Sequence, residues 1–292
     1  MKKKISIIAS FRNEETNINS FIRRIKNSFK KFRNIDYKLI FIDDFSNDSS
    51  NNLIKKAIKK NKKIQLITFK KNYGHNPSVQ TGFNFVRNRD YAVVIDCDLQ
   101  EDPELIAQNF HSIKKNQTIH FVRKKREDPF FQRFYSKIAY LFLHFISSGK
   151  IIMNTNHFKI IPPFVIKKIN KNKERDPYWN YLFTKYSLDN KIVYYIKRKR
   201  HFGISKYNIF TLNPWVSFYS GIHYFRKRFR FLILSLLLIN IMILLLVLYN
   251  FTSFFLILFS SFSILILIAN LFISFFMAHY KKKNKRIYCK YK

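Results

Sequence analysis

The chain is poor in cysteine and in glycine, with 2 and 5 of them among 292 residues. Cys97 follows an apolar run and Cys289 lies near the C-terminus, so we expect no disulfide between them, and this scarcity fits a reducing compartment. Where glycine is this rare, the glycines that remain in motifs are expected to serve backbone positions with positive φ or a close approach of two segments. Gly74, Gly82 and Gly203 are such candidates.

Acidic residues are also scarce: 17 Asp and Glu stand against 54 Lys and Arg, for a formal net charge of +37. Such a charge would suit a nucleic acid, but the lysines are spread along the whole chain and no recognisable nucleic-acid module is present. We therefore predict no nucleic-acid partner. An anionic membrane surface suits the charge equally well. No signal peptide is expected, because residues 1–4 lead into a short strand pattern rather than a long apolar core.

Short apolar runs alternate with amphipathic helical patterns in the first hundred residues. The runs with the length of strands are 5–9, 39–42, 64–69 and 91–95. This alternation predicts an α/β fold with a mainly parallel sheet covered by helices on both faces. Ligands of such sheets bind at the carboxyl ends of the strands, where Glu14, Asp44 and Asp96 all fall.

The fourth apolar run leads directly into Asp96 and Asp98, which are followed by the amide of Gln100. Two like charges at the end of a buried strand are costly unless a cation lies between them. In an extended chain these three side chains would point to one side, and three oxygen ligands suit Mg²⁺ or Mn²⁺. The pattern therefore predicts a metal site completed by substrate phosphates. The alternative is an acidic turn that caps a helix beginning near Pro103.

Two long uncharged runs, 231–249 and 254–277, are each long enough to cross a bilayer. Basic clusters flank their outer ends and none lies between them, so both ends are expected at the cytoplasmic face. We therefore predict a transmembrane helical hairpin in the cytoplasmic membrane, with the N-terminal domain in the cytoplasm. The predicted divisions are a cytoplasmic α/β domain at 1–206, amphipathic juxtamembrane helices at 207–230, two transmembrane helices at 231–279 and a basic cytoplasmic tail at 280–292.

An amphipathic helix with a wide aromatic face is predicted over 129–147. Packing against the core of the domain is one explanation for such a face. The other is that the helix lies in a membrane interface.

Several short motifs follow one another along nearly the whole chain. They are Asn-Glu-Glu at 13–15, Ile-Asp-Asp-Phe-Ser at 42–46, Asn-Tyr-Gly-His at 72–75, the acidic motif at 96–105, Arg-Lys-Lys-Arg-Glu-Asp-Pro-Phe-Phe at 123–131 and Phe-Gly-Ile-Ser-Lys-Tyr at 202–207. Together with the two apolar runs, they resemble inverting family-2 glycosyltransferases of the polyprenyl-phosphate type, which include dolichyl-phosphate mannose synthases and bactoprenol glucosyltransferases. The resemblance implies a nucleotide-diphospho-sugar transferase (GT-A) fold, a nucleotide-diphosphate sugar donor and a polyprenyl (undecaprenyl) phosphate acceptor. It also allows a homo-oligomer.

The resemblance further implies the residues of the site. The metal, Mg²⁺ or Mn²⁺, would be held by Asp96, Asp98 and Gln100, and would stabilise the departing nucleotide. The residues implied in catalysis are Asp96, Asp98 and His157. Those implied in binding the nucleotide sugar are Ser10, Arg12, Glu14, Asp44, Asp96, Cys97, Asp98, Arg123, Arg200 and Lys206.

Some positions depart from the family pattern. Ser10 and Arg12 stand where Pro and Tyr are usual, which affects selectivity for base or sugar. Phe45 stands where a Gly usually follows the paired aspartates, which would make that turn less mobile. His157 stands where the family has an Asp that is sometimes assigned as the base or as a contact of the acceptor.

The acceptor decides what His157 has to do. A lipid phosphate, with a second pKa of about 6, is largely dianionic at neutral pH and needs no strong base, so His157 would bind or orient it. A hydroxyl of a lipid-linked glycan would need a base, and His157 would be the candidate. Two further alternatives stay open: His157 as a merely packed residue, and the whole chain as an inactive membrane-bound scaffold that binds a nucleotide sugar or a partner protein.

Overall fold

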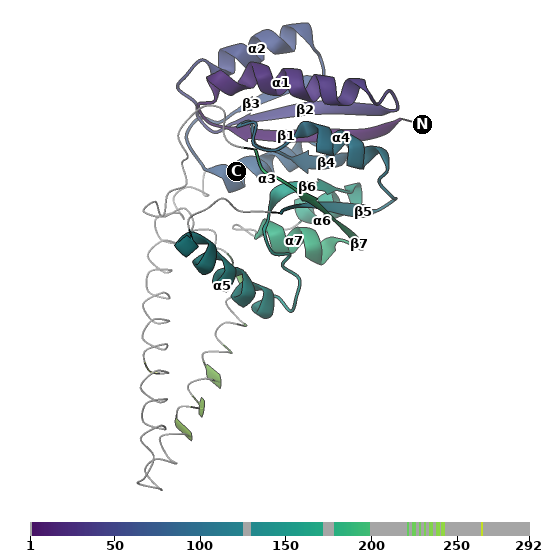
Figure 1. The fold of residues 1–292 in the computed structure, drawn as a ribbon. Coiled ribbons are helices and arrows are strands. Elements are labelled where there is room, and N and C mark those ends of the chain that lie inside the picture. Colours follow the sequence, from purple (N-terminus) through teal and green to yellow (C-terminus); the bar gives the residue numbers. More distant parts are fainter. Residues whose placement is uncertain are drawn as a thin grey trace.

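The computed structural model describes residues 2–124, 130–171 and 178–198, and single residues or pairs between 221 and 264. Its centre is a seven-stranded sheet in the order β3-β2-β1-β4-β6-β5-β7 (Figure 1). The strands are β1 (Lys3–Phe11), β2 (Ile35–Asp43), β3 (Ile64–Thr68), β4 (Tyr91–Val94), β5 (Gln117–Arg123), β6 (Thr155–Ile161) and β7 (Asp189–Tyr195).

Most of the strand pairs are parallel. β1 pairs in parallel with both β2 and β4, β2 with β3, and β5 with β7. Only β6 runs the other way, antiparallel to both β4 and β5. The predicted α/β fold with a mainly parallel sheet is therefore confirmed for this part of the chain.

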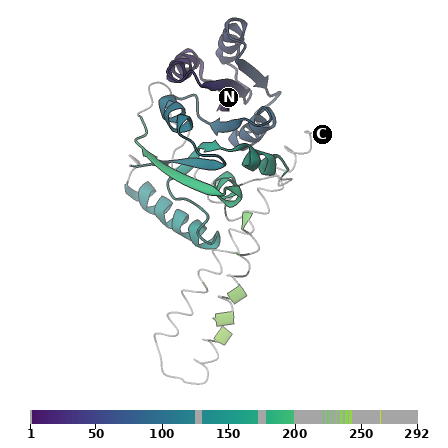
Figure 2. The ribbon, with the colours of Figure 1, turned by 90° about the vertical axis from the view of Figure 1, so that its right-hand side faces the viewer.

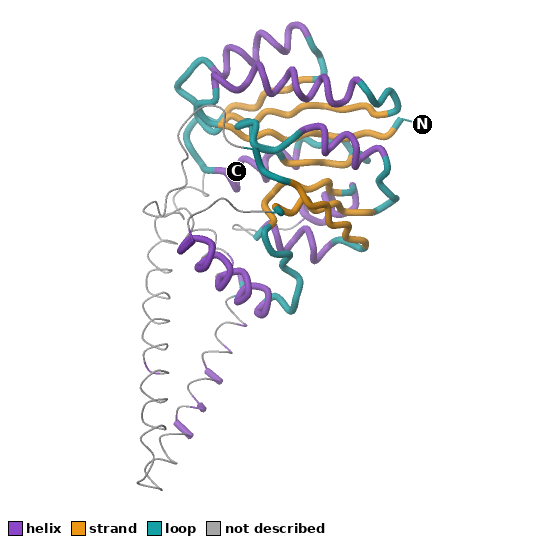
Figure 3. Tube along the Cα trace, viewed as in Figure 1, coloured by secondary structure: helices purple, strands orange, loops and turns teal. Residues whose placement is uncertain are grey.

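Helices cover both faces of the sheet, and Figure 3 shows the strands as one layer between them. The helices are α1 (Glu15–Lys30), α2 (Ser50–Lys60), α3 (His75–Asn84), α4 (Pro103–His111), α5 (Phe130–Ile146), α6 (Pro163–Lys171) and α7 (Trp179–Tyr186). Helices α1 and α4 bury their apolar residues in the hydrophobic cluster on one face, while α3, α6 and α7 pack into the cluster on the other. In α1 the buried residues recur at helical spacing, as Ile18, Phe21, Ile25 and Phe29.

Two of the scarce glycines meet the expectation from the sequence. Gly74, at the start of α3, has φ +92°, and a Cβ at Gly82 would lie 2.3 Å from Cγ2 of Ile8. Gly82 therefore lets α3 pack closely onto β1. Gly203 lies outside the described residues.

The two predicted membrane-spanning runs fall almost wholly outside the described residues, as does the predicted division after residue 206. Within the part of the chain that is described, no helix is long and apolar enough to cross a membrane. The hairpin and the domain divisions therefore stay predictions.

Helix α5 lies at the end of the domain away from α1 and α2 (Figures 1 and 2). It buries Leu143 and Ile146 in a core cluster, yet Ile138, Leu141 and Phe145 on the same helix are exposed, Phe145 by 69%. Core packing thus accounts for only part of its apolar surface.

Candidate active site

The carboxyl ends of β1, β2, β4, β5 and β7 lie at one edge of the sheet, and β6 begins there because it runs antiparallel. In the sheet, β2 and β3 lie on one side of β1, and β4 lies on its other side. The order of the strands therefore reverses between β1 and β4. Open α/β sheets bind ligands at such a reversal. The polar and titratable residues at or next to this edge include Ser10, Arg12, Glu14, Asp44, Asp96, Asp98, Arg123, His157 and Lys197.

The loop after β4 carries the paired carboxylates, but it is not extended. Cys97 and Asp98 form a turn, and Leu99 follows with φ +63°. Oδ1 of Asp98 accepts a hydrogen bond of 3.1 Å from the backbone N–H of Gln100, which closes the turn locally. The expectation that Asp96, Asp98 and Gln100 alternate along an extended chain is therefore wrong.

The carboxylates nevertheless form one electrostatic unit. The pKa of Asp96 is raised to about 6, first by burial and then by the neighbouring charge of Asp98, while Lys197 and Arg123 oppose the rise. A divalent cation would relieve this repulsion.

The oxygen ligands that the loop after β4 offers suit a metal ion that also binds the substrate. Among the described residues, no group of three His, Cys, Asp or Glu is arranged to hold a metal ion. Asp96 and Asp98 would contribute two carboxylates, and Mg²⁺ commonly binds to one or two protein carboxylates together with substrate phosphates and water. Gln100 as a further ligand stays a prediction.

Glu101 is a third acid in this unit that the sequence analysis did not single out. It is only 2% exposed, and burial, followed by the charges of Asp96 and Asp98, raises its pKa to about 7. Its Oε1 accepts a hydrogen bond of 2.8 Å from Nδ2 of Asn156 and lies 3.7 Å from Nη2 of Arg123. The signal in the sequence would have been the run of three acids from Asp96 to Glu101 directly after a buried strand.

Two cations face these acids. Arg123 ends β5, and its Nε donates to the Tyr195 hydroxyl at 3.4 Å. Lys197 follows β7, and its pKa is lowered by burial and by the charge of Arg123. The next residue, Arg198, donates its backbone N–H to the carbonyl of Gln100 at 3.0 Å, which attaches this segment to the carboxylate loop. Lys197 was not predicted, whereas the predicted Arg200 and Lys206 lie outside the described residues.

Asp44 fixes the loop that leads into α3. Its two carboxylate oxygens accept the backbone N–H groups of Tyr73 at 2.7 Å and Gly74 at 2.9 Å. Burial raises the pKa of Asp44, while these two bonds and the charge of Arg12 oppose the rise. Glu14 begins α1 and accepts a bond of 2.7 Å from Nδ2 of Asn17. Both acids lie where the nucleotide pocket is predicted, and both already hold protein groups.

Two histidines from different elements face each other at the same edge. The ring centroids of His75 on α3 and His157 on β6 are 4.8 Å apart, and Oγ of Ser10 lies 3.0 Å from Nδ1 of His75. Nδ1 of His157 is buried and has no hydrogen-bond partner among the residues that the structure describes. Burial lowers the pKa of both imidazoles, and for His157 the charges of His75 and Lys159 add to the effect. Both rings are therefore neutral near pH 7.

The sequence was compared with those of known families and proteins. The model of glycosyl transferase family 2 matches residues 6–173, which is more than half of the chain. The chain belongs to glycosyl transferase family 2. The resemblance noted from the motifs is thereby confirmed.

Relatives of this family-2 member include an uncharacterized glycosyltransferase, YkcC, of Bacillus subtilis, 27% identical over 69% of this chain and 62% of its own length. A bactoprenol glucosyl transferase of Shigella phage SfV is 27% identical over 70% of this chain and 67% of its own length. The chain thus spans about two thirds of the length of the curated relatives it matches.

A solved structure with a similar fold is mannosyl-3-phosphoglycerate synthase from Rubrobacter xylanophilus. It covers 78% of this chain and 74% of its own, with a TM-score of 0.50 and 11% identity. The likeness supports the GT-A-like α/β fold and nothing finer.

Cys97, predicted in the donor site of this glycosyltransferase, has a side chain that is only 2% exposed and belongs to the core cluster. Burial, followed by the charges of Glu14 and the two aspartates, raises its pKa, so the thiol is protonated. A contact of Cys97 with the donor would have to come from its backbone.

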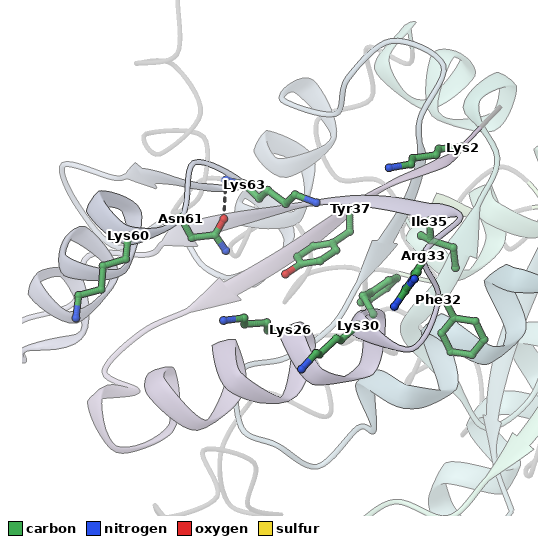
Figure 4. A pocket seen from close by; sticks show the side chains of 11 residues that line it. Lys2, Lys26, Lys30, Phe32, Arg33, Ile35, Tyr37, Lys60, Asn61 and Lys63 are labelled. Atoms are coloured by element: carbon green, nitrogen blue, oxygen red, sulfur yellow. Dashed lines mark hydrogen bonds between the residues drawn. The ribbon is translucent and has the colours of Figure 1, made fainter.

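A hollow of about 640 Å³ lies at the opposite edge of the sheet (Figure 4). Lysines from α1 and from the connection between α2 and β3 lie on two sides of the Tyr37 ring there. Two of these cations, Lys30 and Lys60, lie in the last turns of α1 and α2, where positive charge interacts favourably with the helix dipole. No carboxylate or histidine is among its lining residues, which are Lys2, Lys26, Phe29, Lys30, Phe32, Arg33, Ile35, Tyr37, Lys60, Asn61 and Lys63.

Proposed function

We propose that this family-2 glycosyltransferase moves a sugar from a nucleotide-diphosphate sugar to polyprenyl (undecaprenyl) phosphate at the cytoplasmic face of the membrane. The observation that carries the proposal is the meeting of Asp96 and Asp98 with Arg123 and Lys197 at the edge where the strand order reverses. Carboxylates and cations side by side suit a metal-bound pyrophosphate. The relatives that are named bactoprenol glucosyl transferase support the lipid phosphate as acceptor.

The donor would bind with its phosphates at the carboxylate loop. A Mg²⁺ or Mn²⁺ ion held by Asp96 and Asp98 would act as a Lewis acid on the leaving nucleotide. Arg123 would bind phosphate oxygens through its planar guanidinium, and Lys197 would add a point charge. Glu14 and Asp44 would lie toward the nucleoside, at the ends of β1 and β2.

The reaction would be one in-line displacement with inversion. An oxygen of the acceptor phosphate forms a bond to the anomeric carbon while the bond from that carbon to the donor pyrophosphate breaks, and the nucleoside diphosphate leaves with the electron pair. No proton has to be removed from a dianionic phosphate. The protein would therefore accelerate the reaction mainly by holding the two substrates in line.

The environment of His157 supports a phosphate acceptor. Its low pKa makes it a weak base, whereas a neutral imidazole can still donate one hydrogen bond to a phosphate oxygen. Its unpartnered, buried Nδ1 is the atom that a ligand would satisfy.

Transfer to a hydroxyl of a lipid-linked glycan is the second candidate, because the same Nδ1 could accept the proton of a hydroxyl. The two candidate functions are distinguished by an assay in which undecaprenyl phosphate is the sole acceptor. The donors are a panel of labelled UDP, GDP and dTDP sugars, supplied with Mn²⁺. We expect a charged lipid product that mild acid cleaves. If no donor yields product with this acceptor but a lipid-linked glycan is labelled, the first candidate is excluded.

The predicted hairpin at 231–279 and the juxtamembrane segment at 207–230 would keep the sheet edge near the lipid phosphate. The exposed apolar residues of α5 support such a location. If the full-length chain leaves the membrane fraction in high salt without detergent, the hairpin is excluded.

A further inference from the structure

Two bulky apolar residues of the described chain have left-handed backbone conformations, in which L side chains are strained. They are Phe45 with φ +66° and Leu99 with φ +63°. Leu99 is 5% exposed and packs in the core cluster, so the burial of its side chain compensates for the strain. Phe45 is 49% exposed, so packing of its side chain compensates for much less of its backbone strain than in Leu99.

The conformation of Phe45 is imposed by its turn. On its N-terminal side, the N–H of Asp44 donates to the carbonyl of Phe11 at 2.9 Å. On its C-terminal side, the N–H of Ser46 donates to Oδ1 of Asp43 at 2.9 Å, and Oγ of Ser46 accepts the N–H of Asn13 at 2.9 Å. A glycine would adopt this conformation without steric cost. The turn is therefore the one that suits the Gly of the family pattern, but it carries an aromatic ring.

Phe45 lies in the turn after β2, at the edge of the sheet where the donor is proposed to bind, and its side chain is about half exposed. Phe45 directly follows Asp44, whose carboxylate is fixed by Tyr73 and Gly74 and lies in the field of Arg12. The metal loop is on the other side of β1, so the turn after β2 is at the nucleoside end of the site rather than at the phosphate end. Strained residues persist where the surrounding structure imposes their conformation, and they cluster at active sites and ligand clamps.

We infer that Phe45 is a substrate-binding residue that stacks on the nucleobase of the donor. The inference rests on the proposed function, since it assumes a nucleotide-diphosphate sugar as donor. Aromatic rings stack on any base through its flat face, so Phe45 would raise the affinity for the nucleoside part without reading hydrogen-bonding groups.

The test separates binding from folding. The purified full-length chain is compared with Phe45→Asn, because Asn tolerates the left-handed conformation but lacks the ring. We expect the dissociation constants of UDP and GDP, measured with Mn²⁺ by calorimetry, to rise about 5- to 100-fold. The affinity for inorganic pyrophosphate, which has no base, should be unchanged. The melting temperature without ligand should be equal or higher, because strain is released.

Two further variants complete the test. Phe45→Tyr keeps the ring and should bind nucleotides like the original chain. Arg89→Gly is the matched control. Arg89 has φ +71° and lies near the amino end of β4, away from the candidate site. Its replacement should release backbone strain and leave the nucleotide affinity unchanged.

Phe45→Asn binding UDP and GDP as tightly as the original chain would overturn the inference alone. A melting temperature lowered by more than about 5 °C would also overturn it, because it would show that Phe45 stabilises the fold itself. Failure of the original chain to bind any nucleoside diphosphate would instead overturn the proposed function, and the inference with it.

Discussion

The two halves of the sheet differ in how their chemistry is built. In the donor half, β3-β2-β1-β4, all strands are parallel and the carboxyl edge carries acids such as Asp44, Asp96 and Asp98. In the acceptor half, β6-β5-β7, one strand is reversed, and the same edge carries Arg123, His157 and Lys197. The first half supplies the acids proposed to bind the metal and the nucleoside. The second supplies Arg123 and Lys197, proposed to bind the donor phosphates, and the neutral His157, proposed to contact the lipid phosphate.

The two halves also differ in how some of their polar residues are held. Donor-half residues are held by bonds within or between neighbouring loops, such as Asp98 to the N–H of Gln100. Acceptor-half residues depend on buried polar contacts between distant strands and helices. Lys159 of β6, fully buried, donates to the carbonyl of Asn156 and, at 2.8 Å, to Oδ1 of Asn180 in α7.

The largest expected effect lies in the donor half. Asp98→Asn keeps an oxygen that can accept the N–H of Gln100 but removes the charge, so the loop should persist while metal-assisted turnover falls at least about 1000-fold. Sugar transfer with Mn²⁺ measures it, and circular dichroism checks the fold. Asp36→Asn, at the opposite edge of the sheet, is the control that should keep full activity. Undiminished transfer by Asp98→Asn would remove the proposed metal role.

The contrast between the halves also appears in what the sequence could predict. The first four strands were expected near their observed places, because each is a compact apolar run bounded by polar residues. β2 begins at residue 35 rather than 39, since its first residues alternate between buried and partly exposed and interrupt the apolar run. In the acceptor half, β5, α6 and α7 were not predicted, because polar residues such as His120 and Lys159 are buried there through partners far along the chain.

The site residues show the same contrast between local patterns and contacts far along the chain. Asp96, Asp98 and Asp44 occur in local motifs and were predicted as site residues. Lys197 was missed because the pairing of β7 with β5 brings it beside the acids, which no local pattern contains. Glu101 was missed although it belongs to the run of acids after β4, because the sequence does not show its burial.

The next effect concerns stability in the acceptor half. Burial lowers the pKa of Lys159 from 10.5 to about 7, so between these values the unfolded chain binds more protons than the folded one. The free energy of unfolding should therefore rise with pH in this window, by up to about 1.4 kcal/mol per pH unit. Lys159→Met should lose this slope.

Urea denaturation of both chains at pH 7.5 and 9.5 measures the slope, because the contributions of other lysines cancel in the difference. Lys159→Arg, which stays charged over the whole range, should remain destabilised at both values. Equal slopes for the original chain and Lys159→Met would show that Lys159 is charged in the folded protein.

A smaller effect tests the packing of the donor half. Gly82→Ala would bring a Cβ within 2.3 Å of Ile8, so α3 must shift and the free energy of unfolding should fall by about 1–3 kcal/mol. Gly74→Ala meets no atom within 4 Å and should cost only the strain of φ +92°, about 1 kcal/mol. Thermal unfolding of the two variants compares them. A larger loss for Gly74→Ala would contradict close packing as the reason for Gly82.

The smallest effect decides which acceptor the second half serves. If His157 donates a hydrogen bond to a lipid phosphate, His157→Ala should raise the KM for undecaprenyl phosphate about tenfold and leave kcat within about threefold. His157→Gln, which keeps a donor but cannot act as a base, should recover much of the affinity. If His157 instead removes a proton from a hydroxyl, both variants should lose about 100-fold or more in kcat. The recovery by glutamine thus separates a binding group from a base, since only a binding group can be replaced by an amide.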